Sequence, residues 1–261
     1  SKYSLALDGK LSARVLGTPV LTAFPFHLDG LTSLRFHPFR VSFSNFAINL
    51  GNTRGKLNMS MNLGQSMSIN NFNYRLQPFD LTEFLRFLPV GYHPYVNRIT
   101  TDLIVEASAR LTAPYKFSAD RLPSFVIDFE VPEGEVGYTV NSHQSYTMHH
   151  SQVSGQFNFN GDNAASSFFV LKPFALYAGG VALRMQGSIS HLLDNPEVRA
   201  SVSITADLQR IGHRPELRQY ALKGQLDADA DISFGLDKLT GPDIHNIRLE
   251  GTAALGRFEM V

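Results

Sequence analysis

Three carboxylates at alternate positions, Asp227, Asp229 and Asp231, are the first residues whose spacing suggests chemistry, because such a run can open a calcium-binding loop. An EF-hand loop also needs glycine at its sixth position and glutamate at its twelfth. Ile232 and Lys238 occupy those positions here. The alternation is more typical of the solvated face of a β-strand, so we expect no calcium site.

His149 and His150, with His143 nearby, are the next candidates, because imidazole is a common metal ligand. Neighbouring residues of a strand point to opposite faces of a sheet, so His149 and His150 would not bind one metal. Glu133 and Glu135 flank a turn glycine and are better explained as exposed turn residues than as a glycosidase carboxylate pair. The sequence also has no phosphate-binding loop, dinucleotide fingerprint or G-x-S-x-G motif. We therefore predict no catalytic residues, no metal and no cofactor.

The composition excludes several further classes. Lysine and arginine total 23 and are balanced by 23 acidic residues, so no electrostatic signal predicts binding to nucleic acid or to an anionic membrane surface. Cysteine is absent, which excludes a disulfide scaffold. No apolar run approaches the roughly 20 residues of a membrane helix. The sequence begins and ends inside strand patterns, and we expect it to be a piece of a longer protein.

A helix followed by a strand organises the chain, and this arrangement occurs twice. Asp80 can cap a short helix over residues 80–88, and a strand is predicted over residues 99–111. Asp207 opens a second short helix, and a strand is predicted over residues 226–234. Phe46 and Phe174 begin two further matching segments in the same order. We predict one continuous β-repeat region over residues 1–261, with internal repeats at 1–121 and 122–243 and a third beginning at 244–261.

Apolar and polar residues alternate with period two along most of the chain, which predicts an all-β, mainly antiparallel fold. A change of phase at Asn70-Asn71 predicts a β-bulge, and Asp29-Gly30 predicts a hairpin turn. Two short helices cannot cover so much apolar strand surface. The sheet therefore either closes on itself, as a β-sandwich or barrel, or curls around a ligand that completes its apolar layer.

Three segments carry a resemblance to a known family: residues 122–131 (LPSFVIDFEV), residues 192–198 (LLDNPEV) and residues 222–229 (LKGQLDAD). Together with the order of helices and strands, they resemble the AsmA-like proteins of Gram-negative envelopes, particularly their C-terminal repeat region. The likeness runs from Phe36 to the C-terminus and is strongest between residues 80 and 236.

The resemblance implies a periplasmic location, in a protein held in the inner membrane by an N-terminal helix outside this sequence. It also implies similarity to bridge-like lipid transfer proteins, in which a long, twisted sheet curls into a half-pipe. The apolar lining of such a groove binds or conducts phospholipid or another acyl-chain lipid, in support of outer-membrane assembly and lipid homeostasis. No enzymatic activity is expected. The predicted lining residues are Val41, Phe43, Leu57, Met59, Met61, Leu103, Val105, Phe125, Ile127, Phe129, Leu183, Met185, Val202 and Ile204.

An alternative from another class of protein is a β-sandwich module that binds carbohydrate or acts as an adhesin. Exposed aromatic platforms would favour this alternative, and the absence of tryptophan counts mildly against it. The molecule that co-purifies with the protein would distinguish the two hypotheses, because phospholipid favours the groove and a bound glycan favours the sandwich module.

Overall fold

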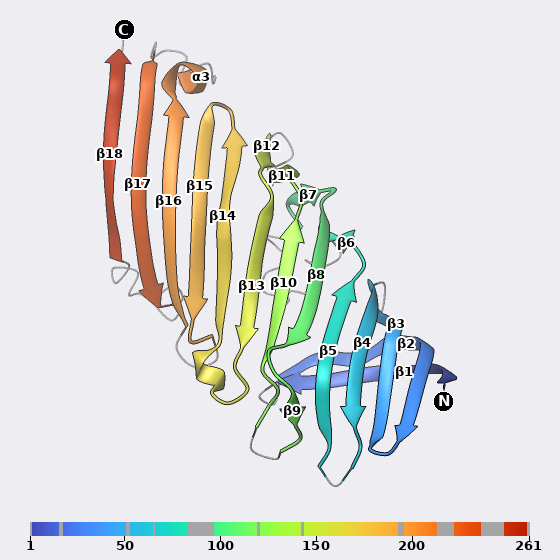
Figure 1. Cartoon of the computed structure of the whole chain (residues 1–261). Helices are drawn as coiled ribbons and strands as arrows, with labels where there is room; N and C mark the ends of the chain where they lie inside the picture. Colours follow the sequence, from blue (N-terminus) through green and yellow to red (C-terminus); the bar gives the residue numbers. More distant parts are fainter. Residues whose placement is uncertain are drawn as a thin grey trace. The chain divides into compact units, whose positions relative to one another are not determined.

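A computed structural model describes residues 2–15, 18–50, 53–64, 66–82, 97–118, 121–141, 144–192, 196–212, 222–235 and 248–259 (Figure 1). Strands joined in antiparallel ladders dominate these residues, which confirms the predicted all-β, mainly antiparallel fold. The strands are β1 (Lys2–Val15), β2 (Thr18–Phe36), β3 (Phe39–Leu50), β4 (Thr53–Asn62), β5 (Ser68–Leu76), β6 (Phe79–Asp80), β7 (Ile99–Thr101), β8 (Ile104–Leu111), β9 (Tyr115–Lys116), β10 (Phe125–Val131), β11 (Gly134–Asn141), β12 (Gln144–His150), β13 (Val153–Phe159), β14 (Phe168–Ala178), β15 (Val181–Ser190), β16 (Glu197–Asp207), β17 (Lys223–Gly235) and β18 (Arg248–Glu259). The helical segments are the 3-10 turn η2 (Ala164–Ser166) and the helix α3 (Leu208–Gly212).

The chain divides into two compact units. Unit 1 comprises Ser1–Phe79, Glu106–Phe129 and Asn158–Ala164. Unit 2 comprises Asp80–Val105, Glu130–Phe157 and Ala165–Val261.

In unit 1, strands β1 to β5 form an antiparallel meander in chain order (Figure 1). Strand β5 then pairs with β8 through Asn73 and Arg110, and with β9 through Ser68 and Lys116. The ladder between β4 and β5 skips Asn70, so the predicted bulge at this position is confirmed.

The hairpin predicted at Asp29-Gly30 is wrong, because β2 continues through both residues. The β2–β3 register instead slips at this point, and Gly30 has a φ of 157°. A Cβ atom on Gly30 would lie 2.7 Å from Cδ2 of Phe46. The glycine is therefore needed because the Phe46 ring lies against its backbone, and not because the chain turns there.

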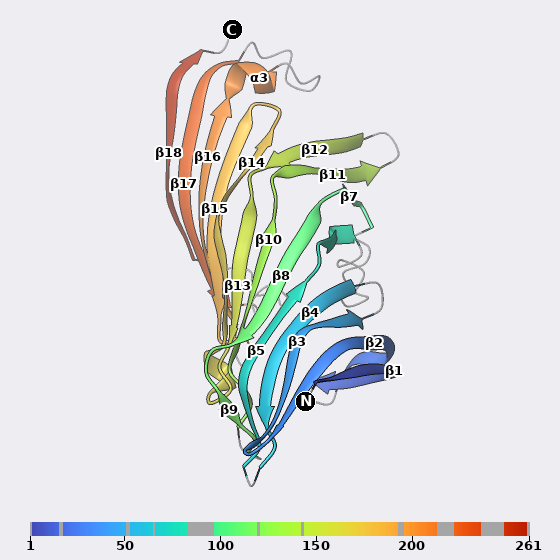
Figure 2. The same ribbon diagram turned by 45° about the vertical axis from the view of Figure 1, so that its right-hand side comes forward.

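In unit 2, strands β14 to β18 form a second meander in chain order. Strand β12 joins this meander where His149 pairs with Tyr177, and β11 pairs with both β12 and β7. Figure 2 shows the β11–β12 hairpin projecting away from strands β14 to β18, which bend along their length.

Aspartate side chains accept hydrogen bonds from backbone N–H groups at the positions where both predicted helices begin. Oδ1 of Asp207 accepts hydrogen bonds from the backbone N–H groups of Gln209 (3.0 Å) and Arg210 (3.2 Å), which confirms the second helix as α3. Oδ1 of Asp80 likewise accepts the backbone N–H of Thr82 at 2.7 Å. Residues 83–88 of the first predicted helix lie outside the described residues.

Strands β3 and β14 share a local irregularity. The β3–β4 register slips by one residue between Phe43 and Phe46, and the β14–β15 register slips in the same way between Leu171 and Phe174. Phe46 and Phe174, which correspond in the predicted repeat, are thus each the first paired residue after a bulge. This agreement is what a repeat would produce, and the repeat itself stays a prediction.

In the part of the chain that the structure describes, neither unit shows the core of a β-sandwich, whose two sheets bury their inner faces against each other. Among the described residues, the buried apolar side chains are Phe46, Leu57, Leu103, Val105, Val126, Val131, Ala175 and Ala206. A β-sandwich built from the described residues would bury many more apolar side chains. Each unit is therefore a single layer of paired strands, and the apolar face of this layer is partly exposed to solvent.

Candidate functional site

The pairing of strands β2 to β5 brings apolar side chains together on one face of unit 1. Val41 lies opposite Met61, and Phe43 lies opposite Met59, so the first predicted lining residues form a continuous surface. All four side chains are half-buried. Residues directly opposite each other in an antiparallel pair share a face and contact one another, which explains how single-strand alternation becomes a sheet-wide apolar surface.

Part of this surface in unit 1 is packed more deeply. Phe46 is 1 % exposed and Leu57, directly opposite it, is 7 % exposed. The rings of Phe43 and Phe46 meet edge to face with centroids 5.1 Å apart. Leu57 therefore belongs to a small local core, whereas its neighbour Met59 remains accessible.

Tyr74 lies beside this core, opposite Leu57 on β5. Its ring covers Gly55, where a Cβ atom would lie 2.4 Å from the phenol oxygen. The hydroxyl is buried and has no hydrogen-bond partner among the described residues. Burial raises the pKa of Tyr74 above its usual value, because the phenolate would lose its hydration.

The apolar face of unit 2 follows the same rule over more strands. Leu183 lies opposite Ile204, which in turn lies opposite Ala228 on β17. Met185 lies opposite Val202 in the adjacent row. These side chains are half-buried although β15 and β16 are interior strands of the meander, because no second described layer encloses them. The predicted lining residues of unit 2 are thus adjacent and accessible.

The remaining predicted residues have different surroundings. Leu103 (5 % exposed) and Val105 (6 % exposed) are buried, and Leu103 lies against Gly134, where a Cβ atom would be 2.3 Å from its Cδ2. These two predicted lining residues are therefore packed in the interior and do not line an open surface.

On β10, Phe125 stacks on Phe159 with ring centroids 5.0 Å apart, and Ile127 and Phe129 are half-buried. The most deeply buried residue of this strand in unit 1 is Val126, at 3 % exposure, on the face opposite Ile127. The alternation of the sequence does not reveal this burial, because it depends on chain segments that are distant in sequence.

The opposite faces of the ladders are polar. In unit 1, ion pairs join Arg75 to Glu106 (3.5 Å) and Arg110 to Asp128 (3.4 Å) across neighbouring strands. These exposed pairs contribute little to stability, but they identify the face that meets water.

The carboxylates considered from the sequence and His149 also lie on polar surfaces, and His143 lies outside the described residues. Ser201 donates a hydrogen bond to Asp231 at 2.6 Å, and His149 is 3.2 Å from Glu135. His150 points to the other face, where its Nδ1 lies 2.7 Å from the Ser151 carbonyl oxygen. Within the described part of the chain, no three such side chains form a possible metal site.

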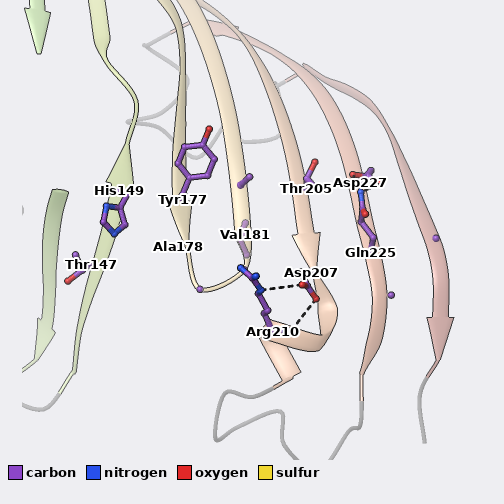
Figure 3. A pocket seen from close by; sticks show the side chains of 15 residues that line it. Thr147, His149, Tyr177, Ala178, Val181, Thr205, Asp207, Arg210, Gln225 and Asp227 are labelled. Carbon is purple, nitrogen blue, oxygen red and sulfur yellow. Dashed lines mark hydrogen bonds and ion pairs between the residues drawn. The ribbon is translucent and has the colours of Figure 1, made fainter. Parts of the chain in front are cut away.

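A hollow of about 950 Å³ opens on the polar face of unit 2, near the turn at Gly179-Gly180 (Figure 3). Strands β12, β14, β16 and β17 contribute His149, Tyr177, Thr205 and Asp227 to its wall. Nothing in the sequence pattern indicated this site, because it depends on the pairing of β12 with β14 across the intervening strand β13.

The fold and these surfaces define an all-β protein with single-layered ladders, apolar on one face and polar on the other. Comparisons with family models, with curated proteins and with solved structures find no match. Among the described helices, none has both the length and the apolar character needed to span a membrane.

Proposed function

We propose that this chain is a non-enzymatic lipid-binding part of a periplasmic, membrane-anchored envelope protein. It holds or conducts the acyl chains of phospholipid along the apolar faces of its ladders, in support of outer-membrane assembly. The observation that carries this proposal is the partial exposure of adjacent apolar side chains in rows, such as Leu183–Ile204 and Met185–Val202. Large contiguous apolar surfaces of this kind mark sites of interaction.

Lipid binding lowers the free energy because it completes the burial of these partly exposed side chains. Each square ångström of apolar surface that an acyl chain removes from water contributes about 25 cal/mol, and the same holds for the acyl chain itself. Met59, Met61 and Met185 lie on these faces, and flexible thioether side chains adapt readily to ligands without fixed shape. These properties favour a mobile hydrocarbon chain over a rigid ligand.

The chemistry of the two faces supports the same conclusion. Acyl chains carry no hydrogen-bonding groups, and the apolar rows offer them none in return. The polar faces, with ion pairs such as Arg75–Glu106, remain suited to water. The periplasmic location and the membrane anchor rest on the resemblance of residues 122–131, 192–198 and 222–229 to AsmA-like proteins.

Native mass spectrometry tests the proposal directly. The protein is purified without detergent, incubated with phospholipid vesicles and separated from them by gel filtration. We expect phospholipid to remain bound to the re-isolated protein, at a level that falls when a charge is placed on the apolar face at Ile204. Protein that emerges from the vesicles free of phospholipid would refute the proposed function.

A further inference from the structure

The hollow on the polar face of unit 2 results from the cross-strand register. One row of paired residues runs across the strands through His149, Tyr177, Ala182, Thr205 and Asp227. Ala182 has the smallest side chain in this row and forms the floor of the hollow. The side chain of Tyr177 therefore faces those of Thr205 and Asp227 across Ala182. Figure 3 labels Tyr177, Thr205 and Asp227, which come from β14, β16 and β17, and β15 lies between the first two strands.

The adjacent row is also interrupted by small residues. It runs from the Gly180 end of β15 through Asp207 and Gln225 to Gly256. Gly256 carries no side chain and leaves the hollow open beside Gln225, whereas Arg210 packs against Gly180 at the other end of the row. Its volume of about 950 Å³ lies within the roughly 300–1,000 Å³ of ligand pockets.

The charges in the hollow disfavour an anionic ligand. Arg210 is the one guanidinium among the described lining residues, and its Nε is 3.4 Å from Oδ2 of Asp207. His149 is similarly engaged with Glu135 at 3.2 Å. A phosphate or carboxylate group would therefore meet a guanidinium that is already paired, together with the carboxylate of Asp227, which forms no ion pair among the described residues.

The remaining groups suit a ligand with several hydroxyl groups. Asp227 already accepts hydrogen bonds from Nε2 of Gln225 at 2.9 Å, so its carboxylate and the Gln225 amide are held together. Such a pair can accept and donate to neighbouring ligand hydroxyls, and bonds to the carboxylate are charge-assisted. Tyr177 is 44 % exposed and offers an apolar ring face beside these polar groups. Thr147 and Thr205 add further hydroxyls.

We infer that this hollow binds a neutral saccharide, with the apolar face of a sugar ring against Tyr177 and its hydroxyls on Asp227 and Gln225. The inference does not depend on lipid binding, because the hollow lies on the face opposite the apolar rows. The chain would then contact a glycan through its polar face.

Saturation-transfer NMR with two neutral disaccharides, cellobiose and chitobiose, tests the inference on the whole chain, with phosphoethanolamine as the charged comparison. We expect transfer to at least one disaccharide and none to phosphoethanolamine. Ala182→Phe fills the floor without removing a polar group, and Asp227→Asn removes the charge while keeping the shape. Each should weaken binding at least about tenfold, which corresponds to the loss of about 1.4 kcal/mol.

Asp229→Asn is the matched control, because Asp229 lies on the same strand and face but outside the hollow. Its affinity should equal that of the unaltered protein. The inference is overturned if neither disaccharide binds, if phosphoethanolamine binds in their place, or if Asp227→Asn and Asp229→Asn lower the affinity equally. If Ala182→Phe fails to fold, as judged by circular dichroism, the comparison of the two asparagine variants decides alone.

Discussion

Placing a carboxylate at Ile204 tests whether the apolar face of unit 2 is open. Ile204 lies on the interior strand β16, between Leu183 on β15 and Ala228 on β17. It is half-buried, and its row contains no charged residue on these three strands. In an open face, water reaches the new carboxylate of Ile204→Asp, whereas a closed core would trap it without a partner.

The expected loss of stability follows from the contacts of Ile204. Each apolar cross-strand pair contributes roughly 0.2–1 kcal/mol, so losing two pairs costs about 0.4–2 kcal/mol. The poor strand propensity of aspartate adds up to about 1 kcal/mol. The free energy of unfolding should therefore fall by about 0.4–3 kcal/mol, which a domain with a stability of roughly 5–15 kcal/mol can tolerate.

Ser203→Asp is the matched control on the same strand. Ser203 faces the polar side between Arg184 and Asp229, whose effects on a new carboxylate oppose each other. The control has the same propensity cost but leaves the apolar row intact. Urea unfolding followed by circular dichroism gives the stabilities, and native mass spectrometry after incubation with vesicles gives the bound phospholipid.

We expect Ile204→Asp to remain folded and to retain at most about a tenth of the bound phospholipid, because an acyl chain would have to lie against a charge. Ser203→Asp should bind lipid normally. Cooperative unfolding of Ile204→Asp in the absence of denaturant would show that this face is a closed core. Equal lipid binding by both variants would remove the face from the proposed function.

Three further changes probe the local packing and are measured by urea unfolding. Leu57→Asp should cost several kcal/mol and prevent folding, because the carboxylate would be buried beside Phe46, whereas Met59→Asp should fold; the same result for both would contradict the difference in burial. Tyr74→Phe should not destabilise the protein at neutral pH, because the buried hydroxyl has no hydrogen-bond partner among the described residues. Burial raises the pKa of Tyr74, so the native protein should lose stability as the pH rises above the usual tyrosine pKa of 10.0. If the Tyr74→Phe variant loses the same amount of stability at alkaline pH, groups other than Tyr74 cause the loss. Asp207→Ala should lower the free energy of unfolding by about 0.5–2 kcal/mol through loss of the α3 cap, and Asp207→Asn should restore most of it.

The sequence by itself determined the local structure of this protein. Period-two alternation identified the strands, and it assigned Met59, Met61, Leu183 and Met185 to apolar faces. The change of phase near Asn70 located a bulge. These features follow from sequence because they depend on neighbouring residues of one strand, whose side chains must alternate between two faces.

Only the tertiary structure decided which apolar residues are buried. Leu103 and Val126 have the same local pattern as half-buried residues elsewhere, yet both lie in the interior. Gly30 has the local signature of a turn, but it lies within a strand where the ring of Phe46 approaches the backbone. Burial and close approach depend on segments that are far apart in sequence. The alternation of residues along one strand therefore cannot predict them.

The polar hollow depends on tertiary structure even more completely. His149 and Tyr177 come together because β12 pairs with β14, although β13 lies between them in the chain. The floor at Ala182 becomes a hollow only when the register places it between Tyr177 and Thr205. Register is a property of strand pairs and is set by long-range packing, so the sequence determined the faces of each strand while the fold decided which side chains meet on them.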